Sequence, residues 1–252
     1  MSLRSRESRE QARHGRPAMA RPISFRSCTE ILQHLASRSA PHALEGMARF
    51  GIQAKKVCGG WTIPELKKLA RQIGRQHALA EELWASGIFE ARVLATLVDE
   101  PARVSSRQMD RWAKDFDNWA VCDGACINLF RYTRFARAKC LAWSRRREEF
   151  VKRAAFALMA GLAVADKAAG DPAFLKFLPV IKCAATDERN FVKKAVNWAL
   201  RQIGKRNPRL RRAAMAAARE IHSLDSRAAR WIASDALREL RSPALQRRLG
   251  LR

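Results

Sequence analysis

The sequence lacks several patterns that define large protein classes. No apolar run approaches the roughly 18 uninterrupted residues of a membrane-spanning helix. No GxxxxGKS/T or GxGxxG motif is present, so nothing indicates a nucleotide-driven enzyme. The five histidines contain no HExxH, and the six cysteines form no CxxC pair. The sequence therefore gives no sign of a membrane protein, a nucleotide-driven enzyme or a HExxH zinc enzyme.

Cysteine usage indicates a reducing compartment rather than a disulfide framework. The thiols are scattered along the chain without disulfide-like spacing. Cys122 and Cys126 could share one helix face, but two thiolates without further ligands make a poor zinc site. We interpret them as small core residues, and we expect no metal and no cofactor.

Positive charge dominates the composition. Lys and Arg total 49 against 24 Asp and Glu, a formal net charge of +25 spread along the whole chain. A field of this sign favours a polyanionic partner, most simply nucleic acid. The alternatives are a basic proteome background or a ribosome-associated protein. A protein-binding scaffold would have a near-neutral or acidic concave surface, which this charge disfavours.

The first 24 residues differ from the rest in composition. They are polar and Arg-rich, and they contain no apolar segment of the kind found in secretory signals. We predict a disordered basic extension over 1–24 and a single domain over 25–252. An organellar transit peptide is the alternative, although Glu7 and Glu10 interrupt its pattern.

From Ser27 onward the apolar residues have helical spacing. Residues 62–74 begin with a predicted capping box, in which Thr62 caps the helix and Glu65 reaches back. Similar periodicity predicts helices over 78–86, 88–99, 106–116, 116–130, 147–166 and 171–186, the last with Asp171 as its cap. No stretch alternates convincingly with period two. The predicted fold class is all-α.

Weak internal similarity indicates a helical repeat. Residues 151–158 (VKRAAFAL) align with 192–200 at a spacing of 41, and 195–200 (AVNWAL) align with 228–233 at a spacing of 33. Drifting periods of this length, each holding a helix pair, are typical of solenoids of the α-α superhelix type. Such a stack presents a concave surface, and a basic concave surface can bind a DNA duplex.

Ordered motifs give these helices a family resemblance. They include MARFGI (47–52), TIPELKKLARQIG (62–74), NWAVCD (118–123), EFVKRAAFAL (149–158) and ERNFVKKAVNWALRQIGKRN (188–207). In order and spacing, the sequence from Met47 to Leu240 resembles the alkylpurine DNA glycosylases of the AlkD type, which are built from HEAT-like repeats. The resemblance implies an α-α superhelix with a basic concave DNA-binding cleft.

The resemblance also implies site residues. NWAVCD places a Trp–Asp pair at Trp119 and Asp123, FVKRAA places an arginine at Arg153, and KAVNWALR places a second tryptophan at Trp198. Phe150 before the arginine and Asn197 before Trp198 depart from the family pattern. We take Asp123, Trp119, Trp198 and Arg153 as the predicted catalytic residues. Arg153 is also predicted to bind the phosphate beside the lesion.

The predicted chemistry follows from the substrate. A purine alkylated at N3 or N7 is cationic, so its glycosidic bond is weakened and its hydrolysis develops oxocarbenium character. Ionised Asp123 could stabilise that cation and orient a water molecule. An indole face against a cationic base contributes about 0.5–2 kcal/mol. Other predicted phosphate contacts are Lys193, Lys194, Arg201, Lys205 and Arg206.

The sequence leaves other interpretations open. Asp123 could be a structural carboxylate paired with an arginine, and Trp61, Trp84, Trp112, Trp143 and Trp231 resemble ordinary core or interface residues. The chain could also be a non-catalytic repeat protein that binds damaged or branched DNA. No lysine stands out as a Schiff-base nucleophile, so we expect a monofunctional glycosylase. We expect a cytoplasmic monomer that acts on double-stranded DNA with alkylated bases, and the resemblance implies that bulky adducts could also be substrates.

Overall fold

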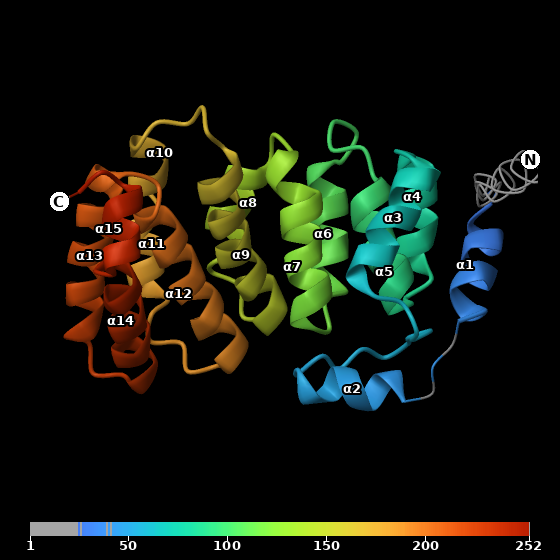
Figure 1. Ribbon diagram of the computed structural model, residues 1–252, viewed down its shortest axis with the longest axis horizontal. Helices are drawn as coiled ribbons and strands as arrows, with labels where there is room; N and C mark the ends of the chain where they lie inside the picture. Colours follow the sequence, from blue (N-terminus) through green and yellow to red (C-terminus); the bar gives the residue numbers. More distant parts are fainter. Residues whose placement is uncertain (1–24, 26, 39, 41, 252) are drawn as a thin grey trace, which may run out of the picture.

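The computed structural model describes residues 25, 27–38, 40 and 42–251 of the 252-residue protein (Figure 1). The predicted N-terminal extension over 1–24 lies outside the described residues. Within them the chain forms helices and no strands, which confirms the predicted all-α class. None of the described helices has the length and apolarity needed to cross a membrane. The helices are α1 (Cys28–Ala36), α2 (Ala43–Arg49), α3 (Ile63–Ile73), α4 (His77–Ala85), α5 (Phe89–Val98), α6 (Ser106–Lys114), α7 (Trp119–Asn128), the 3-10 helix η3 (Phe130–Tyr132), α8 (Ala136–Trp143), α9 (Glu149–Ala165), α10 (Pro172–Leu175), α11 (Leu178–Cys183), α12 (Asn190–Gly204), α13 (Pro208–His222), α14 (Arg227–Leu240) and α15 (Pro243–Arg248).

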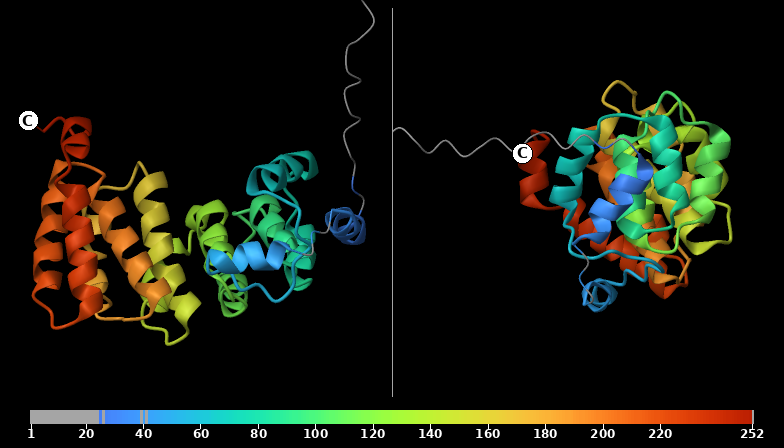
Figure 2. Two further views of the ribbon diagram at one scale, coloured as in Figure 1. Left: turned by 60° about the horizontal axis from the view of Figure 1, so that its bottom comes forward. Right: turned by 90° about the vertical axis from the view of Figure 1, so that its right-hand side faces the viewer.

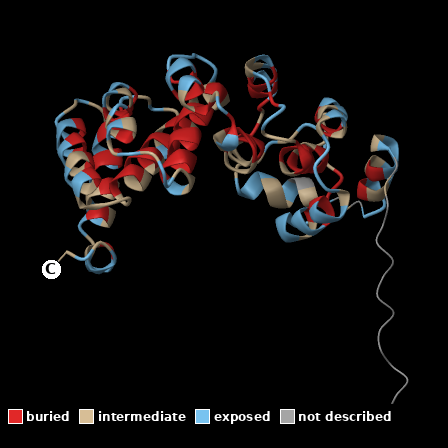
Figure 3. Cartoon of the chain, turned by 90° about the horizontal axis from the view of Figure 1, so that it is seen from above, coloured by how far each residue is buried: buried red, intermediate tan, exposed pale blue. Residues whose placement is uncertain are grey.

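Six helices form one continuous row. Each of α3, α5, α7, α9, α12 and α14 contacts the next, and we call this series the main row. A second layer of helices packs against this row: α4 against α5, α8 against α9, α11 against α12, and α13 against α14. Seen from above, the layers bend into a shallow arch (Figure 3). This is the stacked geometry that the predicted solenoid requires.

Helix boundaries follow local chemistry. Thr62 and Glu65 form the predicted capping box at the start of α3. The predicted single helix over 171–186 was wrong, because the chain forms two short helices, α10 and α11. Pro179 lies in the first turn of α11, where its missing N–H leaves no intrahelical bond unmade, so the chain restarts a helix there.

The repeat spacing agrees with one predicted alignment and not with the other. Helices α9 and α12 begin 41 residues apart, as predicted, whereas α14 begins 37 residues after α12. The side chains of Asn197 and Asp235, 38 positions apart, are hydrogen-bonded across α12 and α14. The alignment at 33 residues, which paired Trp198 with Trp231, was therefore shifted by about one helical turn.

Aromatic side chains of α4, α6, η3 and α8 pack together in the core. Trp84 and Trp112 stack with their ring centroids 4.0 Å apart, and Phe130 lies between Trp112 and Trp143. All four side chains are buried, which confirms the core interpretation of these three tryptophans. Cys122 and Cys126 are also fully buried, and their thiols donate to backbone carbonyls of α9, so they are core residues as predicted.

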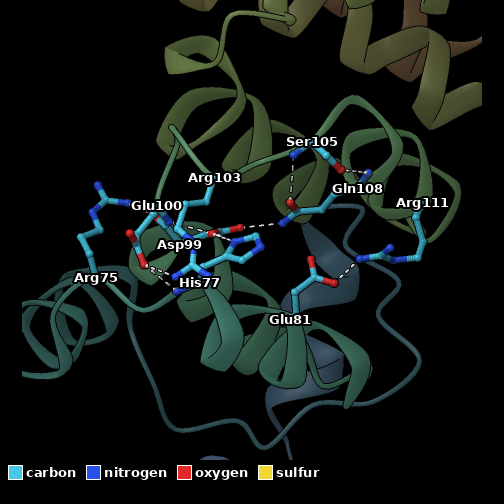
Figure 4. A network of polar contacts seen from close by, with 9 residues as sticks. All are labelled: Arg75, His77, Glu81, Asp99, Glu100, Arg103, Ser105, Gln108 and Arg111. Atoms are coloured by element: carbon cyan, nitrogen blue, oxygen red, sulfur yellow. Dashed lines mark hydrogen bonds and ion pairs between the residues drawn. The ribbon is translucent and has the colours of Figure 1, made fainter.

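A polar network joins the turns at one edge of the stack (Figure 4). Its centre is Asp99, which is fully buried at the end of α5. One carboxylate oxygen contacts Nδ1 of His77 at 2.7 Å and accepts from the backbone N–H of Glu100 at 2.7 Å. The other accepts from the side-chain amide of Gln108 at 2.7 Å. The network ties α4, α5 and α6 together.

The segment 42–60 runs from α1 to α3 and carries α2 across the ends of main-row helices (Figure 1, Figure 2). Its return to α3 passes through Gly59 and Gly60, which both have positive φ. A Cβ atom on Gly60 would lie 1.9 Å from the carbonyl oxygen of Arg38, and only glycine fits there. This segment closes one side of the candidate site.

Candidate functional site

Helix α7 presents Trp119 and Asp123 on one side. Asn118 caps the helix, because its side-chain oxygen accepts from the backbone N–H of Val121 at 3.0 Å. The opposite side, which includes Cys122 and Cys126, is buried against α9. Trp119 and Asp123 are one turn apart and only partly buried. Helical periodicity therefore places them together, as the sequence predicted.

Asp123 is held by Arg153 of α9. Nε of Arg153 donates to one carboxylate oxygen at 2.9 Å, and Nη2 donates to the other at 2.7 Å. This parallel, two-bond geometry is the strong form of an arginine–carboxylate pair. Gly161, further along α9, allows the two helices to approach closely, because an added Cβ would lie 2.7 Å from Ile127. The pair therefore depends on tight packing between α7 and α9.

The geometry gives Arg153 a different contact from the predicted phosphate. Its third donor, Nη1, bonds the carbonyl oxygen of Phe191 at the start of α12, at 2.7 Å. The Arg153 side chain is 8% exposed, and its Nε, Nη1 and Nη2 all donate within the protein. A phosphate contact by Arg153 thus has no support in this arrangement. Its observed role is to hold Asp123 and to join α7, α9 and α12.

Asp123 borders a cavity of about 640 Å³ between α2, α3, α5 and α7, which we call the Asp123 cavity. Its wall is mostly apolar and includes the aromatic side chains of Phe50, Trp61, Phe89 and Trp119. The indole N–H of Trp119 donates to the carbonyl oxygen of Phe50 at 3.0 Å, which fixes the ring at the edge of the segment 42–60. The cavity therefore combines a carboxylate with aromatic faces.

The electrostatics of the pair reflect its burial. Burial raises the pKa of the Asp123 carboxyl, and the nearby guanidinium of Arg153 opposes that rise. Burial alone would lower the pKa of Arg153, but the Asp123 carboxylate outweighs it and the pKa rises. Arg153 therefore stays charged. Each Asp123 oxygen has a second lone pair, so the carboxylate can still accept from a group in the cavity.

Glu90 is the other carboxylate on the cavity wall, and its surroundings differ. Its two oxygens accept from the backbone N–H groups of Cys58 and Gly59 at 2.9 and 2.8 Å. Its side chain is buried, with the residue 2% exposed. Glu90 therefore fixes the loop that leads into α3, and Asp123 is the carboxylate with an exposed edge, at 18% of its side chain.

Trp198 occupies a separate position on α12. It is partly buried and does not line the Asp123 cavity. When the Gln202 amide is oriented to satisfy its neighbours, its oxygen accepts from Nε1 of Trp198 at 3.2 Å and from Nζ of Lys205 at 3.1 Å. The structure thus brings Trp119, Asp123 and Arg153 together and places Trp198 near the basic C-terminal end of α12.

The residues predicted to contact phosphate differ in whether their charged groups already have partners within the protein. Lys194 is exposed, and the described residues include no ion-pair partner for it. Lys193 lies over the ring of Trp231 at 5.6 Å, and Arg201 and Lys205 share the carboxylate of Glu239. Arg206 donates to the carbonyl oxygens of Ala163 and Ala169 at 2.6 and 3.2 Å.

Sequence reasoning missed several residues. Phe50 and Lys67 line the Asp123 cavity but come from α2 and α3, far from α7 in sequence. Trp61, expected to be a filler, borders this cavity while its N–H bonds the carbonyl oxygen of Leu35. Trp231 is not a core residue, because it is 40% exposed, and its role as an interface residue stays a prediction. The Lys and Arg residues close to Trp231 were the available signal for its exposure.

Comparison with known proteins agrees with this architecture. The family model described as "DNA alkylation repair enzyme" matches residues 31–240. Among solved structures, the chain is similar to a member of "a new family of proteins related to the HEAT-like repeat DNA glycosylases with affinity for branched DNA structures", at a TM-score of 0.70 and 19% identity, over 90% of this chain and 97% of that one. A search of curated proteins finds no match. Since the family model spans most of the sequence, the chain belongs to the DNA alkylation repair enzyme family.

Proposed function

We propose that the protein is a DNA glycosylase that hydrolyses the N-glycosidic bond of cationic N3- or N7-alkylated purines in duplex DNA. The observation that carries the proposal is Asp123, a carboxylate fixed by two bonds from Arg153 and facing a mostly apolar, aromatic cavity. Membership of the alkylation repair family supports the same class of substrate.

The chemistry asks little of the protein beyond electrostatics. The cationic base is a good leaving group, so the enzyme need not protonate it strongly. As the bond lengthens, positive charge develops on the deoxyribose, and a fixed carboxylate stabilises it. Arg153 keeps the carboxylate from rotating, and the mostly apolar wall lowers the local dielectric constant and so strengthens the field of the carboxylate. A water molecule that donates to Asp123 would then attack the sugar carbon.

Trp119 would act on the same nucleotide. It stands one turn from Asp123, and its ring is fixed by the bond to Phe50. An indole face prefers a cationic ring to a neutral one by about 0.5–2 kcal/mol. That preference would favour an alkylated base over an undamaged one. Trp198 would contact DNA further along the arch, beside the cationic end of α12.

Release of free base from duplex DNA carrying N-methylated purines tests the proposal. We expect the wild-type protein to release alkylbase and Asp123→Asn to be slower by about a hundredfold or more, with DNA binding retained. Asp225→Asn, which removes the same charge from an exposed turn, is the matched control.

The second candidate function is non-catalytic binding of branched DNA, and the solved structure with that affinity favours it. If wild type and Asp123→Asn both bind DNA and neither releases base, the glycosylase proposal fails. Tighter binding to a four-way junction than to a linear duplex of equal length would then support the second candidate.

A further inference from the structure

A second cavity lies at the other end of the arch, between the C-terminal ends of α9 and α12 and helix α15. Its volume is about 610 Å³, close to that of the Asp123 cavity. Four cationic side chains line it, and none of its lining residues is acidic. We call this cavity the basic recess and define it by Lys167, Lys205, Arg206 and Arg248.

The cations of the basic recess have few acidic partners. Arg206 is fixed by two carbonyl oxygens of the α9 end, and its guanidinium lies 4.0 Å from the ring of Phe174. Arg248 donates to the carbonyl oxygen of Lys205 at 3.0 Å. Lys167 is exposed, and the structure gives it no ion pair among the described residues.

The carboxylates behind the recess are already engaged. Glu239 forms ion pairs with both Lys205 and Arg201. Asp166 pairs with Arg137 at 2.6 Å, and Asp171 accepts from Asn207 at 2.7 Å. Positive charge is therefore left over at the point where α9, α12 and α15 meet. An anion is the ligand that would relieve it.

The recess adjoins Trp198. The oriented amide of Gln202 links Nε1 of Trp198 to Nζ of Lys205, and Gln202 itself lines the recess. An anion seated there would lie beside the tryptophan that the glycosylase proposal places against DNA. A phosphate of a nucleic acid is an anion, and it is joined through the sugar to a base that can lie beside Trp198.

We propose that the basic recess binds a phosphodiester of the DNA backbone and that Lys167 of the α9–α10 loop and Arg248 of α15 close over it. Arg206 supplies the fixed positive charge, and the two exposed side chains supply donors that order on binding. The proposal rests on the proposed function for its choice of DNA, and it adds Lys167, Arg248 and α15 to the contacts expected from the sequence.

Salt dependence of binding to an undamaged duplex tests the recess directly. For the double variant Lys167→Ala/Arg248→Ala, we expect about three- to tenfold weaker binding and a log K against log salt slope smaller by about one, since one phosphate is no longer neutralised. The matched control, Arg107→Ala/Lys114→Ala, removes the same charge from exposed positions of α6. It should change affinity less and leave the slope unchanged.

Several outcomes would overturn the proposal. Equal losses in the two double variants would mean that only the overall charge matters. An unchanged slope in a folded Lys167→Glu variant would contradict the recess even if Arg248→Ala proved unstable. A recess that serves free phosphate would give thermal stabilisation of wild type by inorganic phosphate over chloride at equal ionic strength, with duplex binding unaffected by the double variant.

The two proposals fail separately. If wild type releases base and the double variant keeps the wild-type salt slope, the recess proposal fails and the glycosylase proposal stands. If wild type releases no base and the double variant shows the expected smaller salt slope, the glycosylase proposal fails and the recess proposal stands.

Discussion

Asp99 is fully buried and Asp123 is partly buried, and the surroundings of these two aspartates differ. Asp99 is fully buried, and its partners come from three neighbouring turns: His77, Glu100 and Gln108 (Figure 4). Asp123 has a single side-chain partner, Arg153, and keeps an edge on a cavity of about 640 Å³.

The contrast separates a structural carboxylate from a candidate catalytic one. Asp99 accepts hydrogen bonds from several directions and does not line the Asp123 cavity. A single arginine can neutralise Asp123 while one side of the carboxylate remains available. Well-formed hydrogen bonds therefore do not distinguish the two roles, whereas the cavity beside Asp123 does. Three predictions test this distinction, in decreasing order of their expected effect on base release.

The largest effect is expected from Arg153→Met. This change leaves Asp123 buried without its partner, which should destabilise the protein by about 3–5 kcal/mol and slow base release by about a hundredfold or more. Denaturant unfolding and single-turnover base release are the measurements. Asp123→Asn/Arg153→Met should regain part of the stability but none of the activity. Normal release by the folded Arg153→Met variant would contradict the positioning role.

Lowering the pH should remove activity before it removes the fold. Since burial raises the pKa of Asp123, its carboxylate is lost at a pH above the ordinary aspartate value, and base release should fall about tenfold per pH unit below that point. Burial alone would raise the pKa of Asp187, but hydrogen bonds from Arg189 and Lys152 lower it below its usual range. Its stabilising contribution is present above the unfolded value of about 3.9 and is lost only as pH falls through the lower folded pKa.

The measurement is single-turnover base release and circular dichroism over the same pH series, with spontaneous base loss subtracted. Asp123→Asn should show no acidic limb. Simultaneous loss of activity and helical signal in wild type would indicate that acid acts on the fold rather than on Asp123.

The part of this site that lies on one helix was predictable. Trp119 and Asp123 are four residues apart, and a helical period is enough to bring them to one face. The partner of Asp123 was named among the site residues but given to phosphate, because sequence spacing cannot show that Nε and Nη2 of Arg153 both point at a residue 30 positions earlier.

The rest of the Asp123 cavity depended on contacts that no period encodes. Segment 42–60 and the adjoining Trp61 lie outside the repeat. Their sequence pattern therefore did not indicate that Phe50 and Trp61 line the same cavity as Asp123. The exposure of Trp231 has a similar origin. A tryptophan at apolar spacing looks buried, whereas the 37-residue step from α12 to α14 turns this one toward solvent.

The smallest effect on base release is expected from Asp99→Asn. The amide keeps the shape but loses the charge and one acceptor, so a buried donor from His77, Glu100 or Gln108 loses its partner. A cost of about 1–3 kcal/mol in unfolding free energy follows. The rate of base release by the folded protein should not change, because neither Asp99 nor its partners His77, Glu100 and Gln108 line the Asp123 cavity. Comparison of Asp99→Asn with Asp123→Asn, at protein concentrations corrected for the folded fraction, therefore isolates the contribution of the cavity. If both variants lost activity to the same extent, access to open space would not be what distinguishes these two aspartates.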